Sequence, residues 1–286
     1  MYEIVRKRVL NGQVKLFEIM APAVAKKALP GQFVIIRAGE AGERVPFTIS
    51  GTDPERGTIT FIAQEVGKTS KLLGTLNEGD FLLNLAGPLG KPTHFDEGVK
   101  RAIVIGGGLG SAIAYPQSKA LFAKGVLVDT IVGFRNIDLV ILEEEIKAVS
   151  TRLIVTTDDG TYGMKGFVTE ALKMLLESGT KYDAVVAIGP PIMMKVICGM
   201  TLPYKIRTIV SLNPIMVDGT GMCGCCRVTV GGKTRFACVD GPDFDGHEVD
   251  FDELMKRNAM YREHEKQSLD IFEQHICKLE EAGQNA

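Results

Sequence analysis

Four of the six cysteines in this 286-residue chain lie in one short stretch, between Asp218 and Cys238. The pattern D-x4-C-x2-C-x11-C follows the C-x4-C-x2-C…C spacing of 2Fe-2S sites, with aspartate in the place of the first cysteine. Gly219, Gly221 and Gly224 lie around its first cysteines, and glycine readily adopts the left-handed backbone angles that a loop wrapped around a small inorganic core requires. The stretch therefore predicts a 2Fe-2S loop whose ligands are Asp218, Cys223, Cys226 and Cys238.

Other uses of these cysteines agree less well with the sequence. A zinc knuckle could use Cys223 and Cys226, but a tetrahedral site needs a second C-x-x-C or a histidine pair, and neither follows downstream. Disulfides would require an oxidising compartment. Cys225 could replace Asp218 as the fourth ligand, although neighbouring side chains in a loop seldom point at one centre. We favour Asp218 over Cys225.

Length and composition limit the classes of protein to consider. The 286 residues exceed one typical domain, and 45% hydrophobic residues suffice for two cores, so we expect domains over 1–97 and 98–212 and a tail over 213–286. A net charge of −2 gives no general case for binding nucleic acid or an anionic membrane. The sequence shows neither a signal peptide nor a membrane-length apolar run. We therefore expect a cytoplasmic protein with reduced thiols.

Residues 1–97 contain short strands separated by turn residues, a pattern typical of a small antiparallel barrel. The expected strands are 2–10, 14–20, 33–38, 47–50, 58–64 and 81–85, with Asn11-Gly12 as a hairpin turn.

Two stretches of this barrel suit a flavin nucleotide. Arg44, Thr48 and Ser50 place a cation and hydroxyls along one strand, as a phosphate and a ring edge would need. A helix is expected over 70–76, and its free N–H groups and positive dipole end suit a pyrophosphate. Because the upstream glycine of a P-loop is missing, a nucleotide-triphosphatase is excluded. The residues at this helix start are Gly67, Lys68, Thr69 and Ser70.

Between residues 98 and 212 buried strands alternate with helices, which predicts a parallel sheet with right-handed crossovers. Strands are expected over 102–105, 127–132, 152–156, 184–188 and 205–211, and helices near 109–124, 138–149, 166–178 and 191–200. A glycine-rich turn follows the first strand, where the backbone can approach a dinucleotide pyrophosphate. Its glycines are Gly106, Gly107, Gly108 and Gly110.

The ends of later strands carry further candidate nucleotide contacts. Asp138 could bond a ribose 2′-hydroxyl, which favours NAD(H), whereas Arg135 could bind a 2′-phosphate, which favours NADP(H). The residues leave this choice open. Asp158 and the Gly189-Pro190 turn follow two further strands, at the edge where open parallel sheets bind ligands.

Beyond the cysteine stretch, residues 251–279 are rich in Glu, Lys and Arg and predict one or two helices. The remaining cysteines, Cys198 and Cys277, stand singly in apolar helical contexts, and we expect both to be structural.

Taken together and in this order, these motifs resemble the ferredoxin-NADP reductase superfamily, in which an antiparallel flavin-binding barrel precedes a parallel-sheet nucleotide-binding domain. The superfamily motif Arg-x-Tyr-Ser corresponds to Arg44 with Pro46 and Phe47 in the last two positions, and with the hydroxyl displaced to Thr48. The Gly189-Pro190 turn resembles the Cys-Gly-Pro segment that lies near the nicotinamide in that superfamily. The resemblance implies a β-barrel plus α/β fold that ends in a 2Fe-2S loop and a helical tail.

The combination of R-V-P-F-T-I, G-M-C-G-C-C and an aspartate in the first ligand position resembles the small subunits of NADH-dependent reduced ferredoxin:NADP oxidoreductases. The nearest alternative is the electron-transfer subunit of dihydroorotate dehydrogenase, which has cysteine in that position. The resemblance implies FAD, a 2Fe-2S cluster and NAD(H), with hydride exchange on one side and single-electron transfer on the other.

The same resemblance implies electron bifurcation in a heterodimer, in which a larger subunit carries a second flavin and 4Fe-4S clusters. No side chain is expected to act as a catalytic acid or base. A hypothesis of another class is a nucleotide-binding regulatory module with structural zinc in the cysteine loop.

Overall fold

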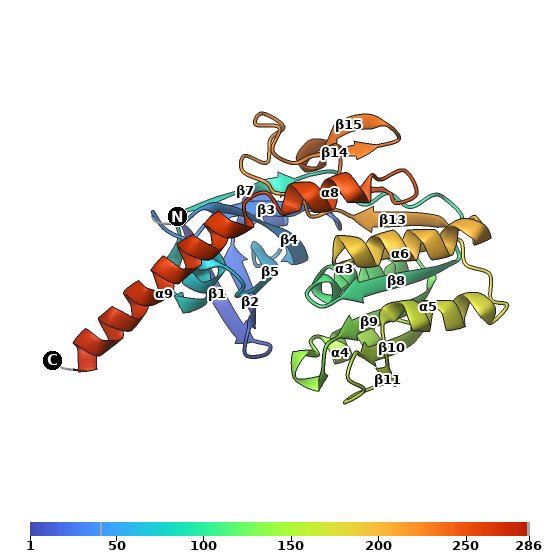
Figure 1. Cartoon of the computed structure of the whole chain (residues 1–286), viewed down its shortest axis with the longest axis horizontal. Helices are drawn as coiled ribbons and strands as arrows, with labels where there is room; N and C mark the ends of the chain where they lie inside the picture. The colour runs from blue at the N-terminus through green and yellow to red at the C-terminus, as the bar shows by residue number, and fades with distance from the viewer. Residues whose placement is uncertain (41, 285–286) are drawn as a thin grey trace.

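The computed structural model of the chain describes residues 1–40 and 42–284, with side chains up to residue 274. Two seven-stranded sheets form its framework. The N-terminal sheet and the central sheet stand side by side, and a two-stranded hairpin lies across their upper edge in the view of Figure 1. This arrangement leaves a space between the two sheets that the cavity described below occupies.

The N-terminal sheet is antiparallel, with the strand order β6-β1-β2-β5-β4-β3-β7, and it confirms the predicted barrel. Strand β4 is longer than expected because a register shift between Ile49 and Gly51 lets it pair first with β3 and then with β5. The strands are β1 (Tyr2–Val9), β2 (Val14–Met20), β3 (Phe33–Arg37), β4 (Arg44–Asp53), β5 (Thr58–Gln64), β6 (Phe81–Leu82) and β7 (Asn84–Leu89).

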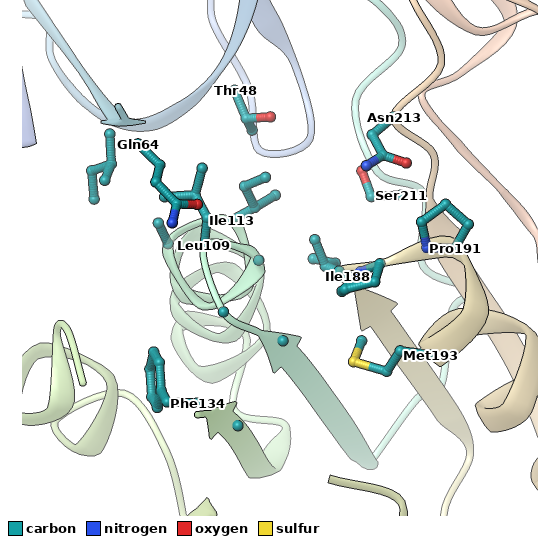
Figure 2. A pocket seen from close by; sticks show the side chains of 18 of the residues that line it. Thr48, Gln64, Leu109, Ile113, Phe134, Ile188, Pro191, Met193, Ser211 and Asn213 are labelled. Atoms are coloured by element: carbon teal, nitrogen blue, oxygen red, sulfur yellow. The ribbon is translucent and has the colours of Figure 1, made fainter. Parts of the chain in front are cut away.

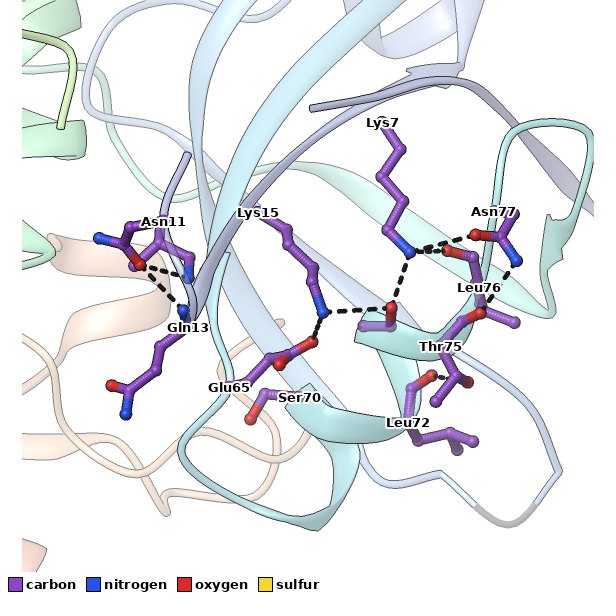
Figure 3. Close-up of polar contacts among 12 residues, drawn as sticks. Lys7, Asn11, Gln13, Lys15, Glu65, Ser70, Leu72, Thr75, Leu76 and Asn77 are labelled. Carbon is purple, nitrogen blue, oxygen red and sulfur yellow. Dashed lines mark hydrogen bonds and ion pairs between the residues drawn. The ribbon is translucent and has the colours of Figure 1, made fainter. Parts of the chain in front are cut away.

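The barrel domain also contains two helices, α1 (Pro22–Ala25) and α2 (Lys68–Thr75). Lys7 Nζ, from β1, donates hydrogen bonds to the carbonyl oxygens of Gly74 and Leu76 at 2.7 and 2.6 Å, at the end of α2 (Figure 3). A cation at this end compensates the negative end of the helix dipole. The barrel thereby holds in place the helix whose first turn carries the G-K-T-S stretch.

The central sheet has the order β11-β10-β9-β8-β12-β13-β16. Its strands pair in parallel except for β16, which pairs with β13 in the antiparallel sense. The parallel sheet was predicted; β16, which comes from the tail, was not. The strands are β8 (Arg101–Gly107), β9 (Leu127–Phe134), β10 (Arg152–Thr157), β11 (Met164–Lys165), β12 (Ala184–Ile188), β13 (Arg207–Ser211) and β16 (Asp243–Asp245).

Helices cover both faces of this sheet. Alternate residues of β8 divide between the two cores: Ile103 and Ile105 pack with α5 (Val168–Glu177) and α6 (Pro191–Thr201), and Ala102 and Val104 pack with α3 (Gly110–Ala123). The predicted helices over 109–124, 166–178 and 191–200 are confirmed within a few residues.

The helix predicted over 138–149 is wrong. The chain there forms a 3-10 turn, η1 (Ile137–Leu139), and a short helix, α4 (Glu143–Lys147). Leu142, between them, has φ 56°, which breaks the helix. It is buried in an apolar cluster that also contains Val14 and Ile62 of the barrel. Burial against the other sheet therefore outweighs helix propensity in this segment.

The tail wraps around both sheets before it leaves the body. The hairpin β14 (Arg227–Val230) and β15 (Lys233–Phe236) is followed by α7 (Ala237–Asp240), β16 and then α8 (Phe251–Asn258), which packs on α6. A 3-10 turn, η2 (Leu202–Tyr204), ends α6. Helix α9 (Arg262–Gln284) contacts α2 and projects past the barrel (Figure 1). Within the part of the chain that is described, no helix is both long and apolar enough to cross a membrane.

Candidate functional site

A cavity of about 1230 Å³ lies between the barrel and the central sheet. Figure 2 shows Thr48 and Gln64 of the barrel above it, Leu109 and Phe134 at one side, and Ser211 and Asn213 on the opposite wall. The floor is formed by the carboxyl ends of the parallel strands. A cavity of this size, with walls from several elements, can enclose large ligands.

The strand order explains why the cavity lies where it does. Strands β9 and β10 extend the sheet on one side of β8, and β12 and β13 extend it on the other. Ligands bind to open parallel sheets in the crevice that forms where the chain order reverses in this way. The crevice opens beside Gly106 and Ile188, which are paired across β8 and β12.

The glycine-rich turn after β8 is a close-packed backbone cradle. A Cβ atom on Gly110 would lie 2.3 Å from the Ile188 carbonyl oxygen, and one on Gly106 would lie 2.6 Å from Ser111 Cα. A Cβ on Gly107 would lie 2.5 Å from Met193 Sδ. Gly108, with φ +56°, faces open space. Side chains are therefore excluded, and backbone can approach a pyrophosphate directly, as dinucleotide sites require.

Strand β4 supplies the barrel wall of the cavity. Pro46, Phe47, Thr48 and Ser50 all line it. The Phe47 ring is stacked on the Phe61 ring, with centroids 4.9 Å apart, so it is fixed by the barrel core. The Ser50 hydroxyl donates to the Thr60 carbonyl oxygen at 3.1 Å. The wall is thus a pre-ordered surface that combines apolar and hydroxyl groups.

Arg44 and the G-K-T-S stretch lie outside the cavity wall. Arg44 Nε and Nη2 each donate, at 3.2 Å, to the carbonyl oxygens of Val217 and Asp218 in the cysteine loop. Ser70 Oγ accepts from the Gly67 N–H at 2.9 Å.

The other two side chains of the stretch contact Glu43. Lys68 forms an ion pair with its carboxylate at 3.3 Å, and Thr69 Oγ1 accepts from its N–H at 3.2 Å. These side chains hold the start of α2 against β4, beside the cavity.

Two of the three charged candidates for nucleotide contacts line the cavity. Arg135 and Asp158 both line the cavity, and the Asp158 N–H donates to the Phe134 carbonyl oxygen at 3.0 Å. Asp138 is exposed in η1 and does not line the cavity. On the other side of the crevice, Gly189 and Pro190 line it at the end of β12.

The cysteine loop packs on the barrel next to the cavity. Cys226 and Cys238 are buried in an apolar cluster with Phe33 and Ile35 of β3, and Phe33 also lines the cavity. A Cβ atom on Gly219, which has φ +84°, would lie 2.4 Å from Ile35 Cδ1. Glycine is therefore required for the loop to approach the barrel this closely.

The thiols of the loop occur in neighbouring pairs. Cys226 and Cys238 lie together in this buried cluster, and burial raises the pKa of Cys238 to about 12. Cys223 is exposed, and its pKa is lowered because backbone N–H groups of Cys225 and Asp218 donate to its sulfur. The Cys225 thiol contacts that of Cys223.

Asp218 lies at the start of this loop. Its Oδ2 accepts from the Thr220 N–H at 3.0 Å and from the Thr220 hydroxyl, and these bonds lower the pKa of Asp218. Among the described residues, no three His, Cys, Asp or Glu side chains are arranged around a single metal ion. A 2Fe-2S core takes two protein ligands on each of two irons, which suits paired thiols rather than one tetrahedral set.

Cys198 is buried in α6, and burial raises the pKa of its thiol to about 12. This agrees with a structural role. The side chain of Cys277 lies outside the described residues.

Sequence reasoning missed the wall formed by Ser211 and Asn213, which line the cavity at the end of β13 and just beyond it. The signal was available, because the carboxyl end of every parallel strand in such a sheet faces the same crevice.

Comparisons with known proteins agree with this architecture. Residues 213–250 match the family profile of the iron-sulfur cluster binding domain of dihydroorotate dehydrogenase B. A Thermotoga maritima relative, a homolog of the dihydroorotate dehydrogenase B (NAD(+)) electron transfer subunit, is 48% identical over 94% of this chain and 95% of its own. The chain belongs to this family of electron-transfer subunits.

Solved structures extend the comparison. A chain from the structure of an NADH-dependent reduced ferredoxin-NADP oxidoreductase, determined for insight into flavin-based electron bifurcation, is 48% identical, with a TM-score of 0.89 over 95% of this chain and 98% of its own. The ferredoxin reductase of carbazole 1,9a-dioxygenase, at 22% identity and a TM-score of 0.61, shares the fold.

Family membership makes the chain an electron-transfer subunit of an NAD(H)-linked flavin iron–sulfur oxidoreductase, with a flavin, an iron–sulfur cluster and NAD(H) as its cofactors. As a subunit of this kind it works with a larger catalytic partner. The match of residues 213–250 to an iron-sulfur cluster binding domain favours the cluster over the alternative of a regulatory module with structural zinc.

Proposed function

We propose that this chain is the NAD(H)-side subunit of a bifurcating NADH-dependent reduced ferredoxin-NADP oxidoreductase. It passes electrons between NAD(H) and a larger partner that carries a second flavin and 4Fe-4S clusters. The observation that carries the proposal is the double role of Phe33, which belongs both to the cavity wall and to the apolar cluster around Cys226 and Cys238. The nucleotide cavity and the cysteine loop thus share one wall. Electron transfer between the two sites requires them to lie this close together.

In this proposal the barrel side of the cavity holds FAD. Pro46, Phe47, Thr48 and Ser50 contact its ring system, supported by their position on the cavity wall. When bound, FAD supplies the exchange between two-electron and one-electron chemistry.

The phosphates of FAD are assigned to the start of α2, where backbone N–H groups are free and the helix dipole is positive. The proposed phosphate contacts are Arg44, Gly67, Lys68, Thr69 and Ser70, which border the cavity from β4 and α2.

The central sheet holds NAD(H). Its pyrophosphate is assigned to the glycine cradle, Gly106, Gly107, Gly108 and Gly110, where the close packing excludes side chains. Its adenosine is assigned to the end that bears Arg135 and Asp158, with Asp138 at the periphery. Its nicotinamide is assigned to Gly189 and Pro190, across the crevice.

The cluster ligands are proposed to be Asp218, Cys223, Cys226 and Cys238. The position of Cys226 beside Cys238 supports one ligand pair, and the backbone N–H of Asp218, which donates to the Cys223 sulfur, brings Asp218 beside Cys223 for the other. The rival ligand, Cys225, contacts Cys223.

An Asp218→Cys variant separates these two possibilities. We expect it to keep the cluster and to change its reduction potential and EPR signal, because an oxygen ligand is replaced by a thiolate. A Cys225→Ser variant serves as the matched control and should leave both unchanged. If Asp218→Cys changed neither the potential nor the EPR signal and Cys225→Ser changed both, the fourth ligand position would belong to Cys225.

We also propose domain boundaries and a cellular location for this chain. The domains are proposed to end near residues 97 and 212, which agrees with the barrel strands lying before residue 90 and the first strand of the central sheet beginning at Arg101. The cytoplasm is the proposed location, supported by the five described cysteines, all of which are free thiols.

The test of the proposed function is a visible absorption spectrum of the anaerobically purified protein during titration with NADH. We expect flavin bands and a broad iron–sulfur shoulder, both bleached by NADH. Bleaching by NADPH alone would reverse the choice of nucleotide, and a colourless protein with bound zinc would overturn the proposal.

The name of the matched cysteine domain favours a second candidate, the electron-transfer subunit of a dihydroorotate dehydrogenase. The purified complex decides between them: dihydroorotate bleaches the flavin in the second case, and NADPH reduces NAD(+) and oxidised ferredoxin together in the first.

A further inference from the structure

The overall chemistry of the proposed function leaves a proton to be removed. A hydride contains one proton and two electrons. When NADH reduces two one-electron acceptors, the products are NAD(+), two reduced acceptors and one H⁺. Each turnover in this direction therefore releases a proton inside the cavity, and the cavity needs a group that can accept it.

The cavity wall itself offers few acceptors. Of its side chains, all of which belong to the described residues, Arg135 and Asp158 alone carry a formal charge. Arginine stays protonated in proteins and cannot accept a proton. Asp158 follows β10, and strands β9 and β8 separate it from the end of β12. The wall near Gly189 and Pro190 presents the hydroxyl of Ser211 and the amide of Asn213 instead.

A carboxyl group lies directly behind Ser211. Ser211 and Asp243 are register partners in the antiparallel pair of β13 and β16, so their side chains lie next to each other on the same face of the sheet. Thr93 Oγ1 donates to Asp243 Oδ2 from the connector between the two sheets. The Gln117 amide of α3 donates in turn to Thr93 Oγ1. Ser211 at the cavity wall, Asp243 and the half-buried Thr93 thus form a continuous line of polar side chains.

We infer that Asp243, acting through the Ser211 hydroxyl, accepts the proton left in the cavity by each hydride and returns it to the solvent before the next turnover. The inference rests on the proposed function, because it needs hydride chemistry in this cavity. Ser211 Oγ receives the proton from the cavity side and gives its own proton to Asp243, so that no charge remains on the hydroxyl.

Two observations besides the hydrogen bonds support this role. Asp243 Oδ1 and Gln117 Oε1 are both buried without a hydrogen-bond partner among the described residues. Buried polar atoms are seldom left unpaired in structural networks. An unpaired carboxylate oxygen is a free position for a proton.

The surroundings of Asp243 are neutral on every side. The elements packed against it contribute Thr93 from the connector, Gln117 from α3, Ser211 from β13 and Gly31 from the barrel, where a Cβ atom would lie 3.1 Å from Asp243 Oδ2. None of these groups is charged or titrates near neutral pH. Burial raises the pKa of Asp243 to about 6, the range in which a group can both take up and release a proton near pH 7.

The test compares Asp243→Asn and Ser211→Ala in the intact complex with its cofactors. Stopped-flow mixing with NADH and ferricyanide, a one-electron acceptor, in weak buffer with a pH-indicator dye follows NADH oxidation and proton release together. We expect both variants to lower turnover at pH 7.5 by about tenfold or more. Flavin bleaching by NADH without ferricyanide should remain, which would show that the nucleotides still bind.

The pH profile separates a proton carrier from a structural residue. Wild-type turnover should fall below about pH 6 as the carboxyl becomes protonated. Asp243→Asn, which keeps a hydrogen-bond acceptor, should lose this limb of the profile, and Asp243→Glu should retain it. Asp245→Asn removes a carboxylate from the exposed end of the same strand and is the matched control; its profile should be that of the wild type.

The inference is overturned if Asp243→Asn and Ser211→Ala keep wild-type turnover and the wild-type pH profile. If Asp243→Asn does not fold, Ser211→Ala decides alone, because it leaves the carboxyl in place and breaks only its link to the cavity. Absence of any bleaching of the wild type by NADH would instead refute the proposed function.

Discussion

Asp243 shows how a residue proposed to accept a proton can lower the stability of the folded protein at the pH where it acts. Its pKa in the folded protein is raised from 3.8 to about 6, so the folded state binds this proton more tightly than the unfolded state. The sign follows from linkage: above pH 6 the buried carboxylate is ionised and costs about 3 kcal/mol, and this cost disappears as the pH falls through 6 toward 4.

Asp243→Asn should therefore raise the melting temperature at pH 8, where the ionised carboxylate is costly, and should have little effect near pH 4. Thermal melts of the two proteins at both values test this, with Asp245→Asn as the control for a general charge effect. A lower melting temperature for Asp243→Asn at pH 8 would contradict the assigned burial.

Gly110 is the second residue whose effect is predictable from geometry. An alanine there would place a methyl group 2.3 Å from the Ile188 carbonyl oxygen, so α3 must move away from β12. We expect Gly110→Ala to cost about 1–3 kcal/mol of folding free energy and to weaken NADH binding. Gly199→Ala, where a Cβ atom meets nothing within 4 Å, is the control and should not destabilise. Denaturant titration and NADH binding measure both effects.

At the scale of elements, the sequence pattern predicts those helices, strands and turns whose conformation depends on neighbouring residues. Alternating short strands indicate the barrel, and the Gly106–Gly110 turn is recognisable because backbone geometry alone imposes it. The pattern does not predict segments whose conformation depends on contacts with residues far away in the sequence. Leu142 leaves the helical path to bury its side chain against the other sheet. The three-residue strand β16 exists only because β13 offers an edge more than thirty positions earlier in the chain.

Helix α2 offers a prediction at this scale. Lys7→Met removes three hydrogen bonds, to the carbonyl oxygens of Gly74 and Leu76 and to Asn77 Oδ1, and it removes the cation from the end of the helix. We expect a loss of about 1–3 kcal/mol of folding free energy and weaker retention of FAD, because the start of the same helix is assigned to the phosphates. Lys26→Met, at an exposed position, is the control. Full retention of FAD by Lys7→Met through gel filtration would argue against this coupling.

For the whole molecule, the decisive features of the site are those that join distant segments. Ser211 ends the last parallel strand and Asp243 lies in the tail, yet the two are neighbours across β13 and β16. Phe33 connects the nucleotide cavity with the cysteine loop although 193 positions separate it from Cys226. No local pattern predicts such contacts, because they depend on how the barrel, the sheet and the tail pack together.

The barrel and the central sheet are joined by an ion pair and by an apolar seam, and their expected contributions differ. Arg8 Nη2 lies 2.6 Å from Glu145 Oε1, but the two side chains are 41% and 35% exposed, so solvent screening limits the pair to about 0.2–1 kcal/mol. Leu142 is 7% exposed within the cluster that contains Val14 and Ile62. Removing most of such a side chain costs about 2–4 kcal/mol.

Leu142→Ala should therefore lower the melting temperature severalfold more than Arg8→Gln, and it should also weaken NADH binding, since the seam holds the two walls of the cavity together. Thermal melts at low and at 0.5 M salt distinguish the two contributions, with salt of about this strength screening exposed pairs but not burial. If Arg8→Gln proved the more damaging change at both salt concentrations, the ion pair rather than the apolar seam would set the spacing between barrel and sheet, and the cavity would be open to control by ionic strength.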